Sequence, residues 1–505
     1  MRLRPSLRSL GCWGLLLLWQ LSLGGCASKE VAVMLPTQHP PPFSTSGAER
    51  MPDRWWTAFE DPALDFQVSR SLDGNFPLAA ALQRLRAAQA LARRESSDLW
   101  LDVDGFAEAD GSFFSAGENQ SLFALGVDAG YQVDLWGEIR SRVEAERLRA
   151  SATEADYHAI ALTLSAEVAR AWFALTEAHA QLALLAEQIE TNETGVKLQE
   201  ARFGLGQVRL PDVLRQRQLV ESTREQAVVV QSRVAILEHR LAVLQGQTPQ
   251  EATYDPAITL PELPSLPQTG LPSQLLLRRP DVRREFLALS AADRDLASAI
   301  SAQYPRLNLA ASITTAAESP EDLFQDWIGS VAGQLIAPLI DGGQRRSEVD
   351  RTTALVRLRF AEYGQTVLVA YREVEDALAR ERYQIDRVAL LRSQLQLARQ
   401  SSNQLREQYL IGDATYLDVL SSITEEQRLQ RTTLSARLDV VLTRIDLYLA
   451  LAGDFDPRLT GLRGLAGGVG PAVPIGQMEP VAPPLPTGPI DLDSNLLDIL
   501  PEPSP

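Results

Sequence analysis

The hydrophobic pattern switches along the chain from a helical period to a strand period and back. Residues 78–94 place their leucines on one helix face. In residues 99–110 apolar side chains take the odd positions and mostly acidic ones the even positions, and residues 123–133 alternate in the same way. Residues 111–120, rich in Gly, Ser and Asn, form a turn. The pattern predicts a helix followed by a strand hairpin, although any surface sheet also has one-sided strands.

A very long stretch without proline follows each strand pair, at residues 137–210 and 343–456. Within the first stretch, apolar residues from Leu164 to Val196 keep a 4-3 spacing if Asn192 fills one position, which is typical of a coiled-coil seam. About 65 helical residues extend roughly 100 Å. We therefore expect a helix long enough to cross a compartment. A simple periplasmic coiled-coil rod would have the same seam.

The chain aligns with itself at one offset of 206 residues, which places Gly137 on Gly343. The best-matched stretch pairs Phe203, Gly206, Asp212, Val213 and Leu214 with Tyr409, Gly412, Asp418, Val419 and Leu420. A second, weaker strand pair occupies residues 307–314 and 327–339. Because one register holds over about 140 positions, we expect two versions of one supersecondary unit.

These patterns divide the chain into six parts. They are a signal peptide (1–25), an N-terminal linker (26–50), the first repeat (51–250), a Pro-rich connection (251–272), the second repeat (273–455) and a Pro-rich acidic tail (456–505). We expect the tail to be disordered because its composition cannot build a core.

The N-terminus has the pattern of a bacterial lipoprotein signal. Arginines precede the apolar run 10–18, which is too short to span a membrane, and the segment ends in Leu23-Gly24-Gly25-Cys26. This lipobox predicts an S-diacylglycerol and an N-acyl chain on Cys26, which anchor the mature protein. An ordinary signal with a chance cysteine is the other reading. Ala27 replaces the Asp that commonly retains lipoproteins at the inner membrane, which favours the outer membrane.

Charge and motif content argue against several other classes. The net charge of -17 disfavours nucleic acid, whose phosphates require a basic surface. Four histidines without an HxxxH cluster do not suggest a metal site, and the chain has neither a Gly-x-Ser-x-Gly motif nor a P-loop. We expect no catalytic residue and no cofactor, and hence no enzyme.

No mature segment reaches about 18 consecutive apolar residues, so strands rather than helices are expected to enter the membrane. Four strands per chain are too few, because single-chain barrels begin at about eight. Three copies would supply twelve strands and assemble the long helices into a tube. The predicted fold class is therefore mainly α with membrane β, a twofold repeat of long helical hairpins plus β-hairpins. As a homotrimer it would form a 12-stranded β-barrel in outer-membrane lipid and a periplasmic α-helical barrel.

The residues also resemble a known family. The segment 131–140, Tyr-Gln-Val-Asp-Leu-Trp-Gly-Glu-Ile-Arg, resembles the strand-to-helix signature of outer-membrane efflux lipoproteins of the TolC and OprM (NodT-type) family. The other matching segments are Trp55-Trp56, 61–64, 276–282, 341–343 and 373–378. The resemblance covers about residues 50–455. It implies a passive, trimeric exit duct joined through a periplasmic adaptor protein to an inner-membrane transporter.

The resemblance also places a gate where the long helices reverse. There Asp212 and Asp418 would form carboxylate rings that favour cations, and the Tyr409 hydroxyl would bond Asp212 between neighbouring hairpins. Ala414 stands where the family pattern has a latch arginine, and Ser421 where it has a further acid. The other reading is that both aspartates only cap the returning helices.

Four glycines mark the points where the chain changes direction. Gly137 and Gly343 follow the strands, and Gly206 and Gly412 lie at the helix reversals. We expect them to be structural turns, since glycine lacks the Cβ that obstructs a sharp turn.

Two other classes compete with the duct: a periplasmic coiled-coil adaptor or scaffold lipoprotein, and a lipid-anchored enzyme with a helical stalk. An adaptor would interrupt one helical hairpin with compact domains, whereas this chain inserts one alternating strand pair in each half. The duct is therefore favoured.

Overall fold

The computed structural model describes residues 41–112, 115, 120–250, 253–270 and 272–451. The signal segment, Cys26 and the tail 456–505 lie outside these residues.

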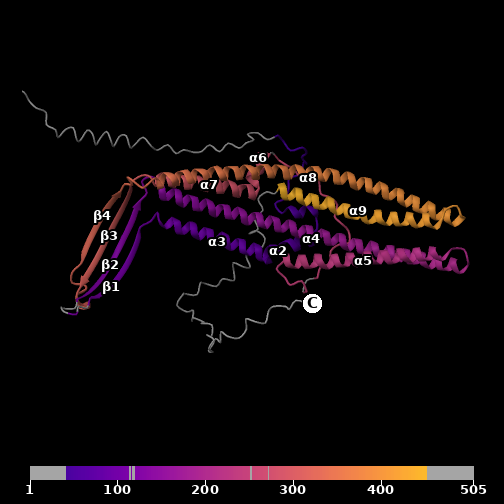
Figure 1. The fold of residues 1–505 in the computed structure, drawn as a ribbon, viewed down its shortest axis with the longest axis horizontal. Helices are drawn as coiled ribbons and strands as arrows, with labels where there is room; N and C mark the ends of the chain where they lie inside the picture. Colours follow the sequence, from indigo (N-terminus) through magenta and orange to yellow (C-terminus); the bar gives the residue numbers. More distant parts are fainter. Residues whose placement is uncertain (1–40, 113–114, 116–119, 251–252, 271, 452–505) are drawn as a thin grey trace, which may run out of the picture. The chain divides into compact units, whose positions relative to one another are not determined.

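Helices dominate the described residues, and one element order occurs in both halves (Figure 1). The first half contains η1 (Trp55–Phe59), α2 (Pro62–Gly74), α3 (Phe76–Ser97), β1 (Asp102–Ser112), β2 (Gln120–Val133), α4 (Glu138–Gly204) and α5 (Leu210–Leu244). The second contains α6 (Pro272–Arg278), α7 (Pro280–Ser301), β3 (Arg306–Ala317), η2 (Pro320–Asp322), β4 (Ile328–Ile336), α8 (Gln344–Ile411) and α9 (Tyr416–Leu451). In each half, a helix leads into two strands and then into a hairpin of long helices.

The helix before the first strand pair begins and ends at local signals. The Asn75 side chain accepts the Leu78 N–H at 3.0 Å, which caps the start of α3. At the other end, the N–H groups of Asp98, Leu99 and Trp100 bond carbonyls three residues earlier. Because these N–H groups are used in the turn, they cannot bond a neighbouring strand. β1 therefore begins at Asp102, whereas the side-chain alternation predicted a start at position 99.

The four strands form one antiparallel sheet in the order β1-β2-β3-β4. β1 and β4 are therefore its edges. The central pair joins the two halves of the chain, with Val127 opposite Ile313. Because β2 runs into α4 and β4 into α8, each half's helical hairpin starts at this sheet.

The largest apolar cluster lies where α4 and α9 pack against the N-terminal helices. Trp55, Trp56 and Trp172 are almost fully buried there. The Trp55 ring lies 5.8 Å from that of Tyr448, and Phe59 lies 5.0 Å from Phe173. The predicted seam takes part: Val168, Ala171 and Leu175 of α4 are buried against this cluster, and Asn192 is 1% exposed.

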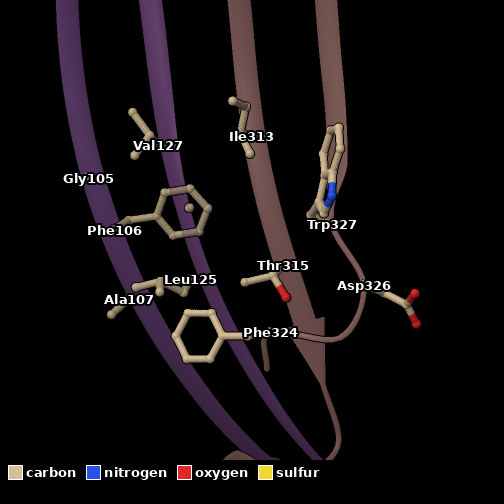
Figure 2. Close-up of a pocket in the computed structure, with 11 residues that line it drawn as sticks. Gly105, Phe106, Ala107, Leu125, Val127, Ile313, Thr315, Phe324, Asp326 and Trp327 are labelled. Carbon is tan, nitrogen blue, oxygen red and sulfur yellow. The ribbon is translucent and has the colours of Figure 1, made fainter. Parts of the chain in front are cut away.

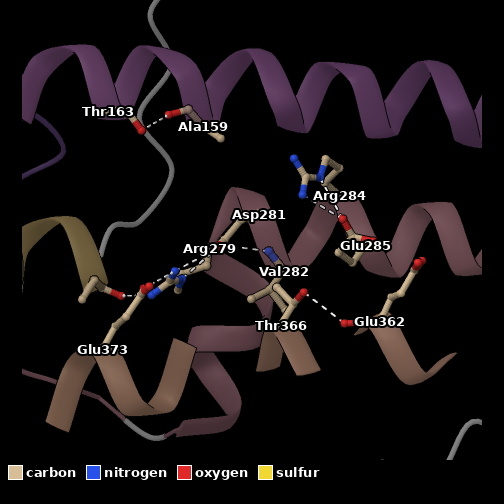
Figure 3. Close-up of polar contacts among 11 residues, drawn as sticks. Ala159, Thr163, Arg279, Asp281, Val282, Arg284, Glu285, Glu362, Thr366 and Glu373 are labelled. Carbon is tan, nitrogen blue, oxygen red and sulfur yellow. Dashed lines mark hydrogen bonds and ion pairs between the residues drawn. The ribbon is translucent and has the colours of Figure 1, made fainter. Parts of the chain in front are cut away.

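Two buried arginines tie the second half together. Arg279 bonds Asp281 at 2.6 Å, Glu373 of α8 at 2.7 Å and the carbonyl of Ala450 in α9 (Figure 3). Burial alone would raise the pKa of Asp281, but the Arg279 guanidinium lowers it. Arg444 bonds Glu381 at 2.7 Å and the carbonyls of Pro264 and Ser265. These contacts fix the Pro-rich connection to α8 and α9.

One helix among the described residues has the length and composition of a membrane span. An 18-residue window of α4 has a mean hydropathy of 1.3, and 67% of that window is buried within the chain. Such burial is typical of a core helix, so this is weak evidence for a span.

Candidate functional site

The sheet has one apolar face that is open to its surroundings. The register places Gly105, Val127, Ile313 and Gly329 in one row. Val127 is 48% exposed and Ile313 60%. This surface lines part of a shallow hollow of about 590 Å³. Figure 2 shows Phe324 and Trp327 of the β3–β4 connection beside it. Exposed aliphatic rows of this kind fit hydrocarbon rather than water.

The opposite sheet face contains a polar row. One row contains Asp104, Asp128, Ser312 and Ser330, and the two serine hydroxyls lie 2.7 Å apart. An apolar face opposite a face that carries acidic and hydroxyl side chains is the arrangement expected of a barrel wall between lipid and a wet lumen.

A carboxylate caps each long helix where it leaves the sheet. Asp134 accepts the backbone N–H groups of Ile139 and Arg140, at 3.2 and 3.0 Å, and also bonds the Arg140 side chain. Asp341 does the same for α8 through Gly343 and Arg345. The family-like segments at these positions therefore build the strand-to-helix corners.

The structure places all four singled-out glycines in the left-handed region. Gly137 (φ 76°) and Gly343 (φ 88°) precede α4 and α8, and Gly206 (φ 72°) and Gly412 (φ 91°) follow them. Side chains with a Cβ rarely adopt this backbone conformation. These positions let each chain segment turn from strand to helix and reverse between helices.

At the first hairpin end, Asp212 is nearly buried and bonds groups of its own helix. Its carboxylate accepts the Arg209 N–H at 3.4 Å and contacts the Arg215 guanidinium at 3.2 Å. Asp212 therefore caps α5, as the alternative sequence interpretation had it.

At the second hairpin end, Asp418 is exposed and caps α9. The Thr415 hydroxyl donates to its carboxylate at 2.6 Å and the Thr415 N–H at 3.0 Å. These two hydrogen bonds lower the pKa of Asp418. The carboxylate therefore stays ionised at neutral pH.

Tyr409 lies among cationic and aromatic side chains. The Arg202 guanidinium sits 4.9 Å above its ring, and the Tyr416 ring lies 5.8 Å away. Arg202 belongs to the first hairpin and Tyr409 to the second, so this contact joins the two ends. The expected bond from Tyr409 to Asp212 stays a prediction.

Sequence reasoning missed a set of buried polar residues between the hairpins. Asn192 and Gln427 exchange two amide hydrogen bonds, at 3.0 and 3.3 Å, and the Tyr416 hydroxyl bonds Gln216. Burial, with smaller contributions from Tyr409 and Asp212, raises the pKa of Tyr416, which keeps the hydroxyl a donor. The one sequence feature that pointed to these buried polar residues was Asn192, a polar residue in an otherwise apolar coiled-coil seam.

An amphipathic sheet that continues into long helical hairpins is the architecture expected of a chain that contributes strands to a membrane barrel and helices to an aqueous compartment. The profile of the family described as Outer membrane efflux protein matches residues 68–247 and 271–453. This chain belongs to that family, and it is an outer-membrane channel of the efflux type. The family assignment sets aside the adaptor or scaffold alternative.

Individual relatives agree. The chain is 28% identical to the pyoverdine export outer membrane protein OpmQ of Pseudomonas aeruginosa, over 81% of this chain and 89% of the relative. It is 26% identical to the cation efflux system protein CusC of Escherichia coli, over 79% and 88%. The solved outer-membrane channel OprN superposes with a TM-score of 0.76 at 27% identity, over 84% of this chain and 99% of that one.

Proposed function

We propose that three copies of this chain form the exit duct of a tripartite efflux system, with a twelve-stranded barrel and a periplasmic helical tube. The observation that carries this is the four-stranded sheet with an exposed apolar face, in which β1 and β4 have no further strand beside them among the described residues. In hydrocarbon an unpaired edge leaves N–H and C=O groups without partners, so the sheet has to close. Pairing β1 of one copy with β4 of the next closes it at twelve strands.

Exposed apolar side chains on the helices support the same assembly. They are Val228, Val229 and Ile236 on α5 and Leu358, Leu390 and Leu397 on α8, each at least half exposed. Apolar rows on both helices of a periplasmic tube are covered when neighbouring copies pack side by side.

The point where the N-terminal segment contacts α8 is compatible with a lipid anchor on Cys26. The Phe43 ring lies 6.4 Å from that of Tyr371, and the Ser44 N–H bonds Glu375. Tyr371 is 27 residues beyond the start of α8 at Gln344, about 40 Å along the helix. The 17 residues from Cys26 to Phe43 can span about 55 Å when extended. The lipid would therefore reach the leaflet where the barrel begins.

The duct would be a passive conduit without a cofactor that works with a periplasmic adaptor and an inner-membrane transporter. Its relatives are named for different cargoes, pyoverdine for OpmQ and cations for CusC. Channels with this one fold thus serve unrelated cargoes. We infer that the inner-membrane partner selects the cargo.

The gate would lie at the hairpin ends. In a trimer Asp212 and Asp418 would each form a ring of three carboxylates, and Tyr409, whose ring contacts Arg202 of the first hairpin, would bond Asp212. Asp418 is exposed and ionised, which suits a cation-selective constriction.

The test uses the lipidated protein extracted from outer membranes. We expect a heat-modifiable trimer on gels and small, cation-selective conductance in planar bilayers. Asp212→Ala combined with Tyr409→Phe should raise single-channel conductance. A monomer that forms no pores would refute the duct, whereas pores whose conductance the double variant leaves unchanged would refute only the gate assignment.

A further inference from the structure

The sheet face that carries the polar row also carries an aromatic side chain, Phe106 of β1. The register places it in one row with Gly126, Thr314 and Ile328. Within the described strands, Phe106 is the only aromatic residue on this face. If this face lines a lumen, Phe106 is the one ring that the strands present to it.

The Phe106 ring lies against the neighbouring strand, in the space left by a glycine. A Cβ at position 126 would lie 2.7 Å from two carbons of the ring. Gly126 is buried although Leu125 and Val127 beside it are exposed, and Phe106 is the one residue of β1 that is partly buried. In Figure 2 the ring lies across β2. Gly126 therefore makes room for the ring, as glycines covered by aromatic rings do in other sheets.

The middle of the two central strands presents mainly small side chains on the same face. They are Ala124, Gly126, Gly130, Ala310, Ser312 and Ala316. Such residues leave the interior of a closed barrel wide. A phenyl ring that stood away from the wall would project well beyond them.

We propose that Phe106 sets the width of the barrel lumen for bulky cargo, and that Gly126 positions its ring against the wall so that such cargo can pass. The proposal rests on the proposed function, which makes this face the lumen wall. It adds a size-determining level inside the barrel, separate from the hairpin ends. Threefold symmetry would place three rings at this level.

The physical reason is the partial removal of the ring from water. Contact with β2 covers part of the ring, which favours this position in a wet lumen. A side chain at position 126 occupies the same space, so the ring has to turn away from β2. Its neighbours on this face of β1 are Asp104 and Glu108, which are charged and offer no apolar surface. We therefore expect a displaced ring to narrow the lumen.

Thiol labelling from the extracellular side measures the width at this level without involving the hairpin ends. Ala310 lies on the helix side of the Phe106 row and Ala316 on the β1–β2 turn side, both in β3 and both exposed. The only natural cysteine after the signal is Cys26, proposed to carry lipid. Ala310→Cys and Ala316→Cys are labelled on intact cells with a small trimethylammonium thiol reagent and with a polyethylene glycol maleimide that still labels Ala316→Cys. The rate at Ala310→Cys relative to Ala316→Cys is compared between the reagents.

Two variants should shift this ratio in opposite directions. Gly126→Ala should lower the ratio for the large reagent several-fold and leave the ratio for the small reagent unchanged. Phe106→Ala should raise the ratio for the large reagent. Combined with Gly126→Ala it should restore at least the wild-type ratio, because no ring is left to displace. Gly130→Ala is the matched control, since a Cβ there has no heavy atom within 4 Å.

Heat-modifiable migration checks that each variant assembles, because a Cβ at Gly126 also lies 2.9 Å from the Ile313 carbonyl oxygen. If Gly126→Ala does not assemble, Phe106→Ala alone decides, and an unchanged ratio for the large reagent would overturn the proposal. Wild-type ratios in assembled Gly126→Ala and Phe106→Ala trimers would overturn it as well. If neither reagent labels Ala310→Cys from outside, this face is not a lumen wall, and the proposed function fails instead.

Discussion

The two long hairpins contact each other in two zones with different side chains. The apolar contact zone, near the N-terminal helices, contains Leu175 of α4 and Ile445 of α9. The polar contact zone runs from Gln181 and Ser435 to Gln216 and Tyr416 at the hairpin ends, where side-chain hydrogen bonds connect the hairpins. In the apolar contact zone, truncating one buried leucine or isoleucine costs about 2–5 kcal/mol. In the polar contact zone, one hydrogen bond contributes a net amount of about 1 kcal/mol. The comparison teaches that one pair of helical hairpins can be held by apolar packing at one end and by weaker hydrogen bonds at the other.

The largest expected effect is on the buried ion pair between α8 and α9, which lies beside the apolar contact zone. Glu381→Gln leaves the buried Arg444 guanidinium without its carboxylate, which is expected to cost about 3–5 kcal/mol. Thermal dissociation of the trimer should shift to clearly lower temperature. The control, Asp439→Asn, removes an exposed partner of Arg387 and should cost at most about 1 kcal/mol. Equal shifts in dissociation temperature for the two variants would contradict the larger contribution assigned to the buried ion pair.

A second prediction contrasts the zones directly. Leu175→Ala opens a cavity in the apolar contact zone and should lower trimer stability by about 2–5 kcal/mol without changing channel conductance. Gln188→Ala, in the polar contact zone, should cost about 1 kcal/mol and raise conductance. Calorimetry and bilayer recording of both variants test this. A change in conductance for Leu175→Ala with none for Gln188→Ala would contradict the division into zones.

Most of the architecture follows from periodicity, because burial on one face imposes a period of 2 on strands and 3.5 on packed helices. The seam from Leu164 and both strand pairs could be predicted for that reason. The start of β1 could not, since three N–H groups after α3 bond back to that helix. Side-chain alternation does not report which backbone donors are already used.

The polar contact zone was not predictable from sequence, because its pairs join residues far apart in the chain. Asn192 and Gln427 are 235 positions apart, and Gln216 and Tyr416 are 200 apart. Whether these side chains face each other depends on how the α4–α5 hairpin packs against the α8–α9 hairpin. No local sequence pattern encodes that packing. The sequence marked only Asn192 as an exception within the seam. The helix-capping contacts of Asp212 and Asp418 match the alternative interpretation of the sequence, because an acid in the first helical turn is a local signal, while the gate role stays a prediction.

The smallest expected effect concerns pH. Hydrogen bonds from Thr415 lower the pKa of Asp418, so its carboxylate stays ionised as the pH falls and is protonated only below its ordinary range. Cation selectivity should therefore be constant between about pH 8 and 5. Reversal potentials in a salt gradient measure this. Thr415→Val should let selectivity decline at a higher pH than in the wild type, and a decline near neutral pH in the wild type would contradict the assignment.

The most direct test of the account clamps the two zones separately. The only cysteine after the signal is Cys26, proposed to carry lipid, so cysteine pairs can be introduced without other free thiols. In the Asp212→Ala and Tyr409→Phe background, a bifunctional thiol reagent should bridge Asn192→Cys to Gln427→Cys or, in the control, Arg170→Cys to Asp446→Cys, a contacting pair beside the apolar contact zone. The account predicts that the first bridge abolishes the raised conductance and the second leaves it unchanged. Equal conductance with both bridges would contradict it.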